Sequence, residues 1–283
     1  MPSNPAAQPP DASVGSSTES RTNSRLTTGQ QYCTQECLRG LLDGGALDKS
    51  CPNAHKHGHD RHQISASVFC TLMQRQLAED LDANFALIGL PGSRGVPFRV
   101  RLASHGYTLA AKCTPPDFVA HLTHEAAVYG RLRPIQGIHV PVHLGNINLV
   151  QPYYYEGIAE LTHVMFLSFG GNPIHEHINA ANRTQLIEQV ESCFHAIHML
   201  DVLHRDAKSR NIIRHEGSGR VMVIDFERAE LRTPRPMLGV ISPNRKRREL
   251  HAGYIKPMLA DQLLPPVYRA RDPSGAGVAQ ARS

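Results

Sequence analysis

The segment that most constrains the fold of this chain is "VLHRDAKSRNIIRHEGSGRVMVIDFERAEL", residues 202–231. Its first half places His204, Arg205, Asp206, Lys208 and Asn211 close together in sequence. The part "IIRHEGSGRVMVID" has two apolar runs around glycine and serine, a pattern typical of a strand, a tight turn and a second strand. Such a hairpin brings its two ends together, so we expect Asn211 and Asp225 at the same edge.

A second hairpin and a helix are predicted earlier in the chain. Alternating apolar runs flank "SHG" in "FRVRLASHGYTLAAKCT", which predicts a β-hairpin whose second strand ends near Lys112. The stretch "PPDFVAHLTHEAAVYGRLRPI" has helical spacing after two prolines, with Glu125 in mid-helix. We expect a Lys112–Glu125 ion pair if this helix folds back on the hairpin. The alternative is an exposed lysine at a strand end.

Three glycines, Gly89, Gly92 and Gly95, lie between two strand-like pieces before this hairpin. Glycines in such a loop let backbone amides approach phosphate oxygens closely. The alternative is that they only make turns.

The rest of the body favours the α+β class. "HVPVHLGNINLVQPYYYEG" and "LTHVMFLSFGG" predict further strands of a mostly antiparallel sheet. "NRTQLIEQVESCFHAIHMLD" predicts an amphipathic helix that leads directly into residues 202–231.

These residues carry a resemblance to protein kinases. His204-Arg205-Asp206-x-Lys208-x-x-Asn211 resembles the catalytic loop H-R-D-x-K-x-x-N, and Asp225-Phe226 resembles the start of the D-F-G motif. With Lys112 and Glu125 in order, the resemblance covers residues 84–231. The chain is also similar to small fungal proteins with a kinase-like domain, which share the Cys-x3-Cys…Cys-Pro-Asn preface and "RLASHGYT", "PIQGIHVPV" and "VIDFERAEL". The resemblance implies a two-lobed fold with an antiparallel sheet in the N-lobe and a shortened helical C-lobe.

The resemblance also implies a catalytic role for the loop. Asp206 would accept the proton of a substrate hydroxyl, and Lys208 would steady the γ-phosphate. Asn211 and Asp225 would bind magnesium, which prefers oxygen ligands.

The nucleotide would be held by the N-terminal half. Lys112 would grip the α- and β-phosphates of ATP, oriented by Glu125, and Gly89, Gly92 and Gly95 would approach the phosphates. The implied activity is ATP- and Mg-dependent transfer of the γ-phosphate to a hydroxyl of serine, threonine or a small molecule, and the acceptor itself is unknown.

Two departures favour an alternative, a catalytically impaired pseudokinase that acts as an interaction module. Glu227 replaces the glycine of D-F-G, which adds a carboxylate near the metal. The remainder of the chain is short, rich in proline and lacks an A-P-E sequence.

A cysteine and histidine cluster precedes the kinase-like region. Cys33 and Cys37 are separated by three residues, and Cys51 follows. Thiolates and imidazoles are the ligands that zinc prefers, so we predict a structural zinc site with His57 as the fourth ligand and His55 as the second choice. A helix that opens at Cys33 would put Cys33 and Cys37 on one face. The alternative is that the cysteines are merely buried.

Composition divides the chain into four parts. Residues 1–30 are rich in Pro, Ser and Thr and are predicted to be a disordered tail. Residues 31–66 form the Cys/His-rich helical segment, 67–231 the kinase-like domain, and 232–283 a Pro/Arg-rich, largely irregular segment.

Charge and hydropathy limit the classes of binding partner that we expect. The net charge is +5, but the basic excess lies partly in the tails, so we do not expect a nucleic-acid partner. A zinc-dependent nucleic-acid binder is the third alternative. No run of 18 apolar residues occurs, so we expect no membrane partner and an intracellular protein, cytoplasmic or nuclear. The cluster Arg245-Lys246-Arg247-Arg248 fits a nuclear localisation patch.

Overall fold

The computed structural model describes residues 31–89 and 91–232. The predictions for the tail 1–30, for the cluster Arg245-Lys246-Arg247-Arg248 and for nearly all of 232–283 lie outside these residues.

An antiparallel sheet of five strands forms the larger part of the fold, in the order β1-β2-β3-β5-β4. Its strands are β1 (Phe85–Leu87), β2 (Val96–Leu102), β3 (Tyr107–Thr114), β4 (His143–Tyr155) and β5 (Ala159–Leu167). The predicted hairpin is confirmed as β2 and β3, paired from Val96 with Cys113 to Leu102 with Tyr107. The sheet and its helices confirm the α+β class.

Successive side chains of a strand point to opposite faces, and this rule decides the role of β3. Leu109, Ala111 and Cys113 are buried in a core shared with the helix α3 (Ala66–Glu79). Lys112 therefore points to the other face of the sheet.

That other face carries the helix α4 (Val119–Arg131). It begins as predicted after two prolines, which form the start of a 3-10 turn, and Glu125 lies buried within it. The short 3-10 helices of the described chain are η1 (Pro116–Phe118), η2 (Arg133–Ile135), η3 (Ile174–Glu176) and η4 (Ser209–Asn211).

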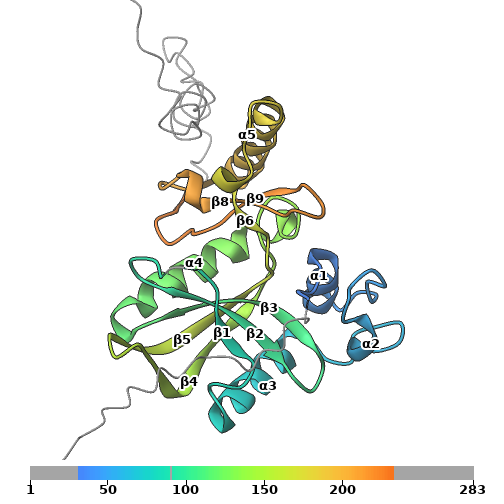
Figure 1. The fold of residues 1–283 in the computed structure, drawn as a ribbon, viewed down its shortest axis with the longest axis vertical. Helices are drawn as coiled ribbons and strands as arrows, with labels where there is room; N and C mark the ends of the chain where they lie inside the picture. Colours follow the sequence, from blue (N-terminus) through green and yellow to red (C-terminus); the bar gives the residue numbers. More distant parts are fainter. Residues whose placement is uncertain (1–30, 90, 233–283) are drawn as a thin grey trace, which may run out of the picture.

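A smaller part of the molecule lies beyond α4 (Figure 1). It contains the helix α5 and two small sheets. Their elements are α5 (Arg183–Met199), β6 (Asn172–Pro173), β7 (Val202–Leu203), β8 (Ile212–Arg214), β9 (Val221–Val223) and β10 (Glu230–Leu231). The predicted helix and the predicted strand–turn–strand are confirmed as α5 and as the antiparallel pair β8–β9. A second core joins α4, α5, β8 and β9.

The Cys/His-rich segment forms two short helices beside β3 (Figure 1), α1 (Gln35–Asp43) and α2 (Ala54–His57). Gly44 ends α1 at a φ of 67°, a conformation that glycine adopts without strain. The expectation that Cys33 opens this helix is wrong, because Thr34 caps it by accepting a hydrogen bond from the N–H of Cys37. Cys33 therefore precedes the helix and does not share a helical face with Cys37.

Candidate functional site

The turn between β7 and η4 carries the first group of polar side chains. Arg205 adopts a φ of 62°, a left-handed conformation that is rare outside glycine and concentrates at functional sites. His204 is buried, and its Nε2 donates to the carbonyl of Ile224 over 2.8 Å. This bond ties the turn to the end of β9, so His204 supports the loop from inside.

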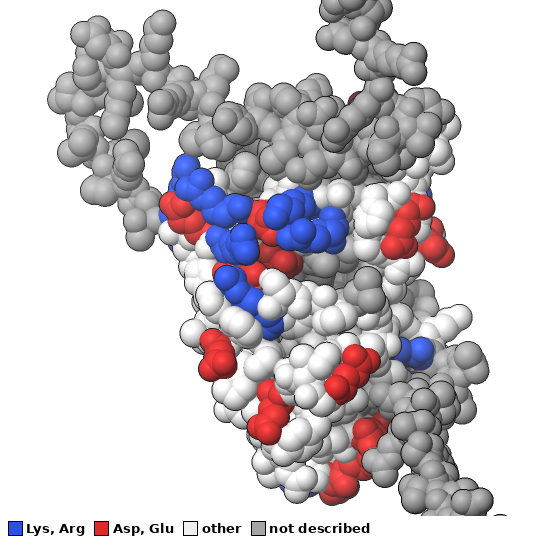
Figure 2. All heavy atoms as spheres, turned by 60° about the vertical axis from the view of Figure 1, so that its left-hand side comes forward, with Lys and Arg blue, Asp and Glu red and all other residues white. Residues whose placement is uncertain are grey.

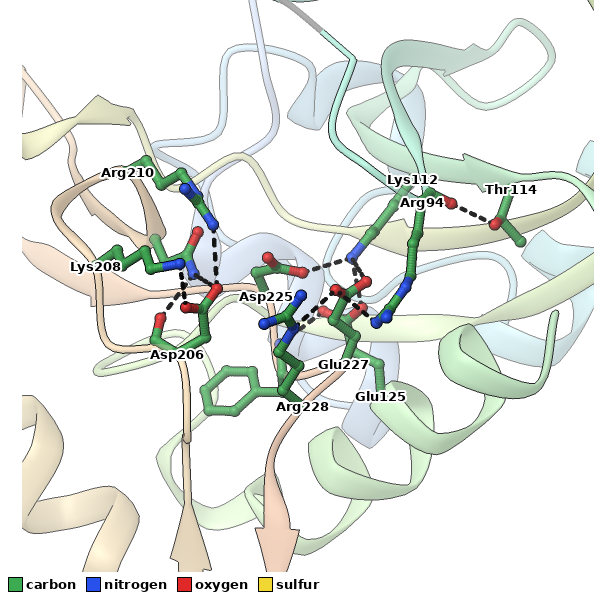
Figure 3. Close-up of polar contacts among 12 residues, drawn as sticks. Arg94, Lys112, Thr114, Glu125, Asp206, Lys208, Arg210, Asp225, Glu227 and Arg228 are labelled. Carbon is green, nitrogen blue, oxygen red and sulfur yellow. Dashed lines mark hydrogen bonds and ion pairs between the residues drawn. The ribbon is translucent and has the colours of Figure 1, made fainter. Parts of the chain in front are cut away.

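Asp206 lies at the centre of this turn, with its carboxylate held by cations (Figure 3). Lys208 Nζ is 2.8 Å from one carboxylate oxygen and Arg210 Nη2 is 3.2 Å from the other. Burial raises the pKa of Asp206, but Lys208 and Arg210 lower it overall. The carboxylate is therefore ionised and able to accept a proton.

Asn211 and Asp225 lie next to each other, as the hairpin predicts. The N–H of Ile224 donates to the carbonyl of Asn211 over 2.9 Å. The amide of Asn211 donates to the backbone oxygen of Asp206 over 2.8 Å, which leaves its side-chain oxygen for another partner. Asp225 also has a left-handed φ, 68°. A carboxylate and an amide oxygen at this edge are the hard ligands that magnesium takes.

Lys112 lies between two carboxylates from distant parts of the chain. Its Nζ is 2.8 Å from Glu125 and 2.7 Å from Asp225. Glu125 is fully buried and also accepts the N–H of Phe226 over 3.0 Å. Burial lowers the pKa of Lys112, but the attraction of Glu125 and Asp225 raises it overall, so the lysine is charged. The expected Lys112–Glu125 ion pair is present, and the exposed-lysine alternative is wrong.

The glycine loop between β1 and β2 lies against this lysine. A Cβ atom on Gly95 would be 3.0 Å from Lys112 Cε, so a side chain there would crowd the ammonium. The N–H of Gly92 donates to the carbonyl of Gly95 over 2.8 Å, and Gly89 has a φ of 83° with open space around its Cβ position. The close backbone, the ammonium and the oxygen ligands fit a magnesium nucleotide.

Two further cations near this site carry no predicted role. Arg94, from the glycine loop, forms a 3.2 Å ion pair with Glu227, and Arg228 lies 3.8 Å from the same carboxylate (Figure 3). Their only signal in the sequence is adjacency to the glycine loop and to Asp225. On one face of the molecule, Lys and Arg side chains lie directly against Asp and Glu side chains (Figure 2).

A separate cluster is formed by Cys33, Cys37, Cys51 and His57, which are all buried and whose ligand atoms lie within 4.8 Å of one another. His57 Nε2 is 3.3 Å from Cys33 Sγ and 3.5 Å from Cys51 Sγ. Ligands of a tetrahedral zinc ion with bonds of 2.0–2.3 Å are about 3.5 to 3.8 Å apart. The cluster could therefore hold zinc. His55 is exposed and outside it.

The surroundings orient these ligands. His57 Nδ1 lies 2.8 Å from the carbonyl of His105, so Nδ1 carries the proton and the lone pair of Nε2 faces the cysteines. The N–H of Thr108 donates to Cys33 Sγ over 3.3 Å. Hydrogen bonding to Cys33 and Cys51, and then burial, raise the pKa of Cys37 far above its usual value, so this thiol keeps its proton when no cation is present. A bound divalent ion would favour the deprotonated thiolate instead.

Comparison with known proteins agrees with this geometry. The profile of the lipopolysaccharide kinase (Kdo/WaaP) family matches residues 172–237, which include the turn around Asp206 and the segment at Asp225. This match and the arrangement of Lys112, Glu125 and Asp225 define a kinase-like protein.

A particular relative is fungal. The chain is 33% identical over 232 residues to the meiotic driver SPOK2 of Podospora anserina, an alignment that covers 79% of this chain and 29% of the relative. The chain thus spans less than a third of that protein's length. The resemblance to fungal kinase-like proteins is confirmed. No helix among residues 31–89 and 91–232 is both long and apolar enough to cross a membrane.

Proposed function

We propose that the chain is an ATP- and Mg-dependent phosphotransferase that transfers the γ-phosphate to a hydroxyl of serine, threonine or a small molecule. One observation carries the proposal: Lys112 contacts both Glu125 and Asp225, so the phosphate-gripping cation and a magnesium ligand face the same space. Phosphoryl transfer depends on such positioning and on neutralising charge.

Each residue then has one task. Asp206 accepts the proton of the acceptor hydroxyl, and Lys208, 2.8 Å away, neutralises the γ-phosphate. Asn211 and Asp225 hold magnesium, which neutralises phosphate charge when bound.

The nucleotide is gripped from the other side. Lys112 holds the α- and β-phosphates with Glu125 fixing its orientation, and the backbone of Gly89, Gly92 and Gly95 approaches the phosphates.

A thermal-shift titration with ATP, with and without magnesium, tests the binding part of this proposal. We expect ATP to raise the melting temperature of wild type in a magnesium-dependent manner and to do so much less for Asp225→Ala, because one metal ligand is lost. Asp206→Ala should keep the shift but lose phosphate transfer. Unchanged transfer in both variants would refute the catalytic roles.

A pseudokinase is the second candidate function, and a specific observation favours it. Glu227 lies 3.8 Å from Lys112 Nζ and adds a third carboxylate around that cation. An interaction module without turnover would show ATP binding without transfer to any acceptor or to water, or no ATP binding at all.

We further propose that Cys33, Cys37, Cys51 and His57 hold a structural zinc ion. The support is the ligand spacing and the proton on His57 Nδ1. The nucleic-acid alternative rests partly on the basic segment outside the described residues.

The architecture of the proposal is a two-lobed kinase-like fold, with the five-stranded sheet in the N-lobe and α5 in the C-lobe. Its domains are the Cys/His segment 31–66 and the kinase-like region 67–231, flanked by the tails. None of the cysteines among the described residues forms a disulfide, which supports the proposal of an intracellular location, cytoplasmic or nuclear.

A further inference from the structure

The glycine loop is joined to the segment after Asp225 by one side chain. Arg94 leaves the loop and its Nη1 lies 3.2 Å from Glu227 Oε1, although the two residues are 133 positions apart. The base of Arg94 is fixed, because its carbonyl accepts a hydrogen bond from the hydroxyl of Thr114 at the end of β3. The guanidinium thus crosses the space between the loop and the Asp225 segment (Figure 3).

Glu227 is placed among cations. Its side chain is only 8% exposed, so its carboxyl group needs cationic partners in place of water. It has three: Arg94 at 3.2 Å, Lys112 at 3.8 Å and Arg228 at 3.8 Å. The three cations around Glu227 therefore form a site that suits a negatively charged group.

The same position suits a phosphate group. Lys112 is the cation that grips the nucleotide phosphates in the proposed function, and it lies beside Glu227. Guanidinium groups bind carboxylates and phosphates with the same forked geometry. A phosphate beside Lys112 would thus meet Arg94 as well, provided that Arg94 releases Glu227.

We infer that Arg94 is a nucleotide-phosphate ligand, and that Glu227 holds its guanidinium by competition while no nucleotide is present. This inference rests on the proposed function. Nucleotide binding exchanges the carboxylate of Glu227 for a phosphate oxygen on Arg94, with no covalent change. Glu227 at the third position of the D-F-G-like motif then weakens nucleotide binding without removing the catalytic groups.

Calorimetric titration with ATP plus magnesium and with adenosine tests the inference on the full chain. Arg94→Gln should weaken ATP binding about tenfold and leave adenosine binding unchanged, since a charge-assisted hydrogen bond to phosphate is lost. Glu227→Gln should tighten ATP binding several-fold. Arg133→Gln is the matched control, because it removes an arginine from an exposed ion pair with Asp43 and should change neither affinity.

The double variant Arg94→Gln with Glu227→Gln tests whether Glu227 weakens ATP binding by holding Arg94 or only by repelling the phosphate. If Glu227 acts through Arg94, the tightening seen for Glu227→Gln disappears when Arg94 is absent. Tightening that persists in the double variant would overturn the exchange. Equal weakening of ATP and adenosine by Arg94→Gln, or no weakening at all, would overturn the phosphate contact.

Two further controls separate failure of the inference from misfolding and from failure of the proposed function. Arg94→Lys keeps a cation in the loop, and it should weaken ATP binding less than Arg94→Gln and leave adenosine unaffected. It replaces Arg94→Gln if that variant melts early, and unchanged ATP binding by it would then overturn the inference. Wild type that binds no ATP would refute the proposed function and this inference together, whereas ATP binding that is insensitive to Arg94 refutes this inference alone.

Discussion

At the scale of single residues, Glu125 shows how the site is held. Its carboxylate is completely buried and has two polar partners, the ammonium of Lys112 and the N–H of Phe226. Water cannot replace either partner, so the bonds matter for folding as well as for the site.

Glu125→Gln should lower the free energy of unfolding by about 1 to 3 kcal/mol, because charged hydrogen bonds in a buried place are weakened. Urea denaturation measures the loss. Glu79→Gln, at an exposed position of α3, should change the free energy by less than about 0.5 kcal/mol. Equal effects of the two changes would contradict the role given to Glu125.

Gly95 and Gly130 are two glycines whose substitution by alanine should have opposite effects on stability. Gly95→Ala puts a Cβ 3.0 Å from Lys112 Cε and 3.2 Å from the carbonyl of Cys113, so we expect a loss of about 1 kcal/mol of stability. Gly130 lies exposed in α4 with nothing within 4 Å of its Cβ position, so Gly130→Ala should be neutral or stabilise by up to about 1 kcal/mol. Denaturation of both variants checks the difference in sign, and a Gly95→Ala protein as stable as wild type would show that the loop has room.

At the scale of elements, α1 and α2 are too short to be stable by themselves. Helices of 9 and 4 residues gain little from their own hydrogen bonds, so they depend on tertiary contacts. Cys37 and His57 lie on these two helices and point into one cluster. Zinc in that cluster would fasten both helices to the hairpin β2–β3 through His105 and Thr108.

Metal analysis tests this dependence. We expect about one equivalent of zinc in purified protein, and chelation should lower the melting temperature, because ion binding contributes to folding. His57→Ala should lose the metal, whereas His55→Ala, at an exposed position two residues away, should keep it. Far less than one equivalent of zinc, with a melting temperature unaffected by chelator, would remove the site.

At the scale of the whole molecule, stability should depend on pH through histidines that are partly or fully buried. Five histidines outside the cysteine cluster have pKa values lowered chiefly by burial, namely His62, His139, His143, His163 and His204. Their unfolded pKa is about 6.5. Below it the unfolded chain binds more protons than the folded chain, so stability is present above pH 6.5 and is lost as pH falls further.

Urea denaturation at pH 7.5, 6.5 and 5.5 measures this dependence. We expect the free energy of unfolding to fall on acidification both with excess zinc and with chelator, which separates histidine protonation from metal release. His143→Gln should reduce the slope, because one proton-binding group is absent. A free energy that stays constant or rises towards pH 5.5 would contradict the prediction.

Local pattern was enough to predict most elements of this fold. Alternating apolar residues predicted the hairpin β2–β3, and apolar residues at helical spacing predicted α4 and α5. A glycine-containing turn between two apolar runs predicted the pair β8–β9. These features depend on neighbours in sequence, whose geometry is the same in any fold. The start of α1 was misplaced because Thr34, one residue after Cys33, is the stronger helix cap.

The sequence by itself was enough to single out Asp206, Asn211 and Asp225 as candidate site residues, since their motif is local. Only the tertiary structure decided that Lys112 meets Asp225 and that Arg94 meets Glu227. Those contacts join segments more than a hundred residues apart, which only the packing of α4, the sheet and the Asp225 segment brings together. Burial fixes which charges must pair, and burial is a property of the packed molecule and not of any one segment.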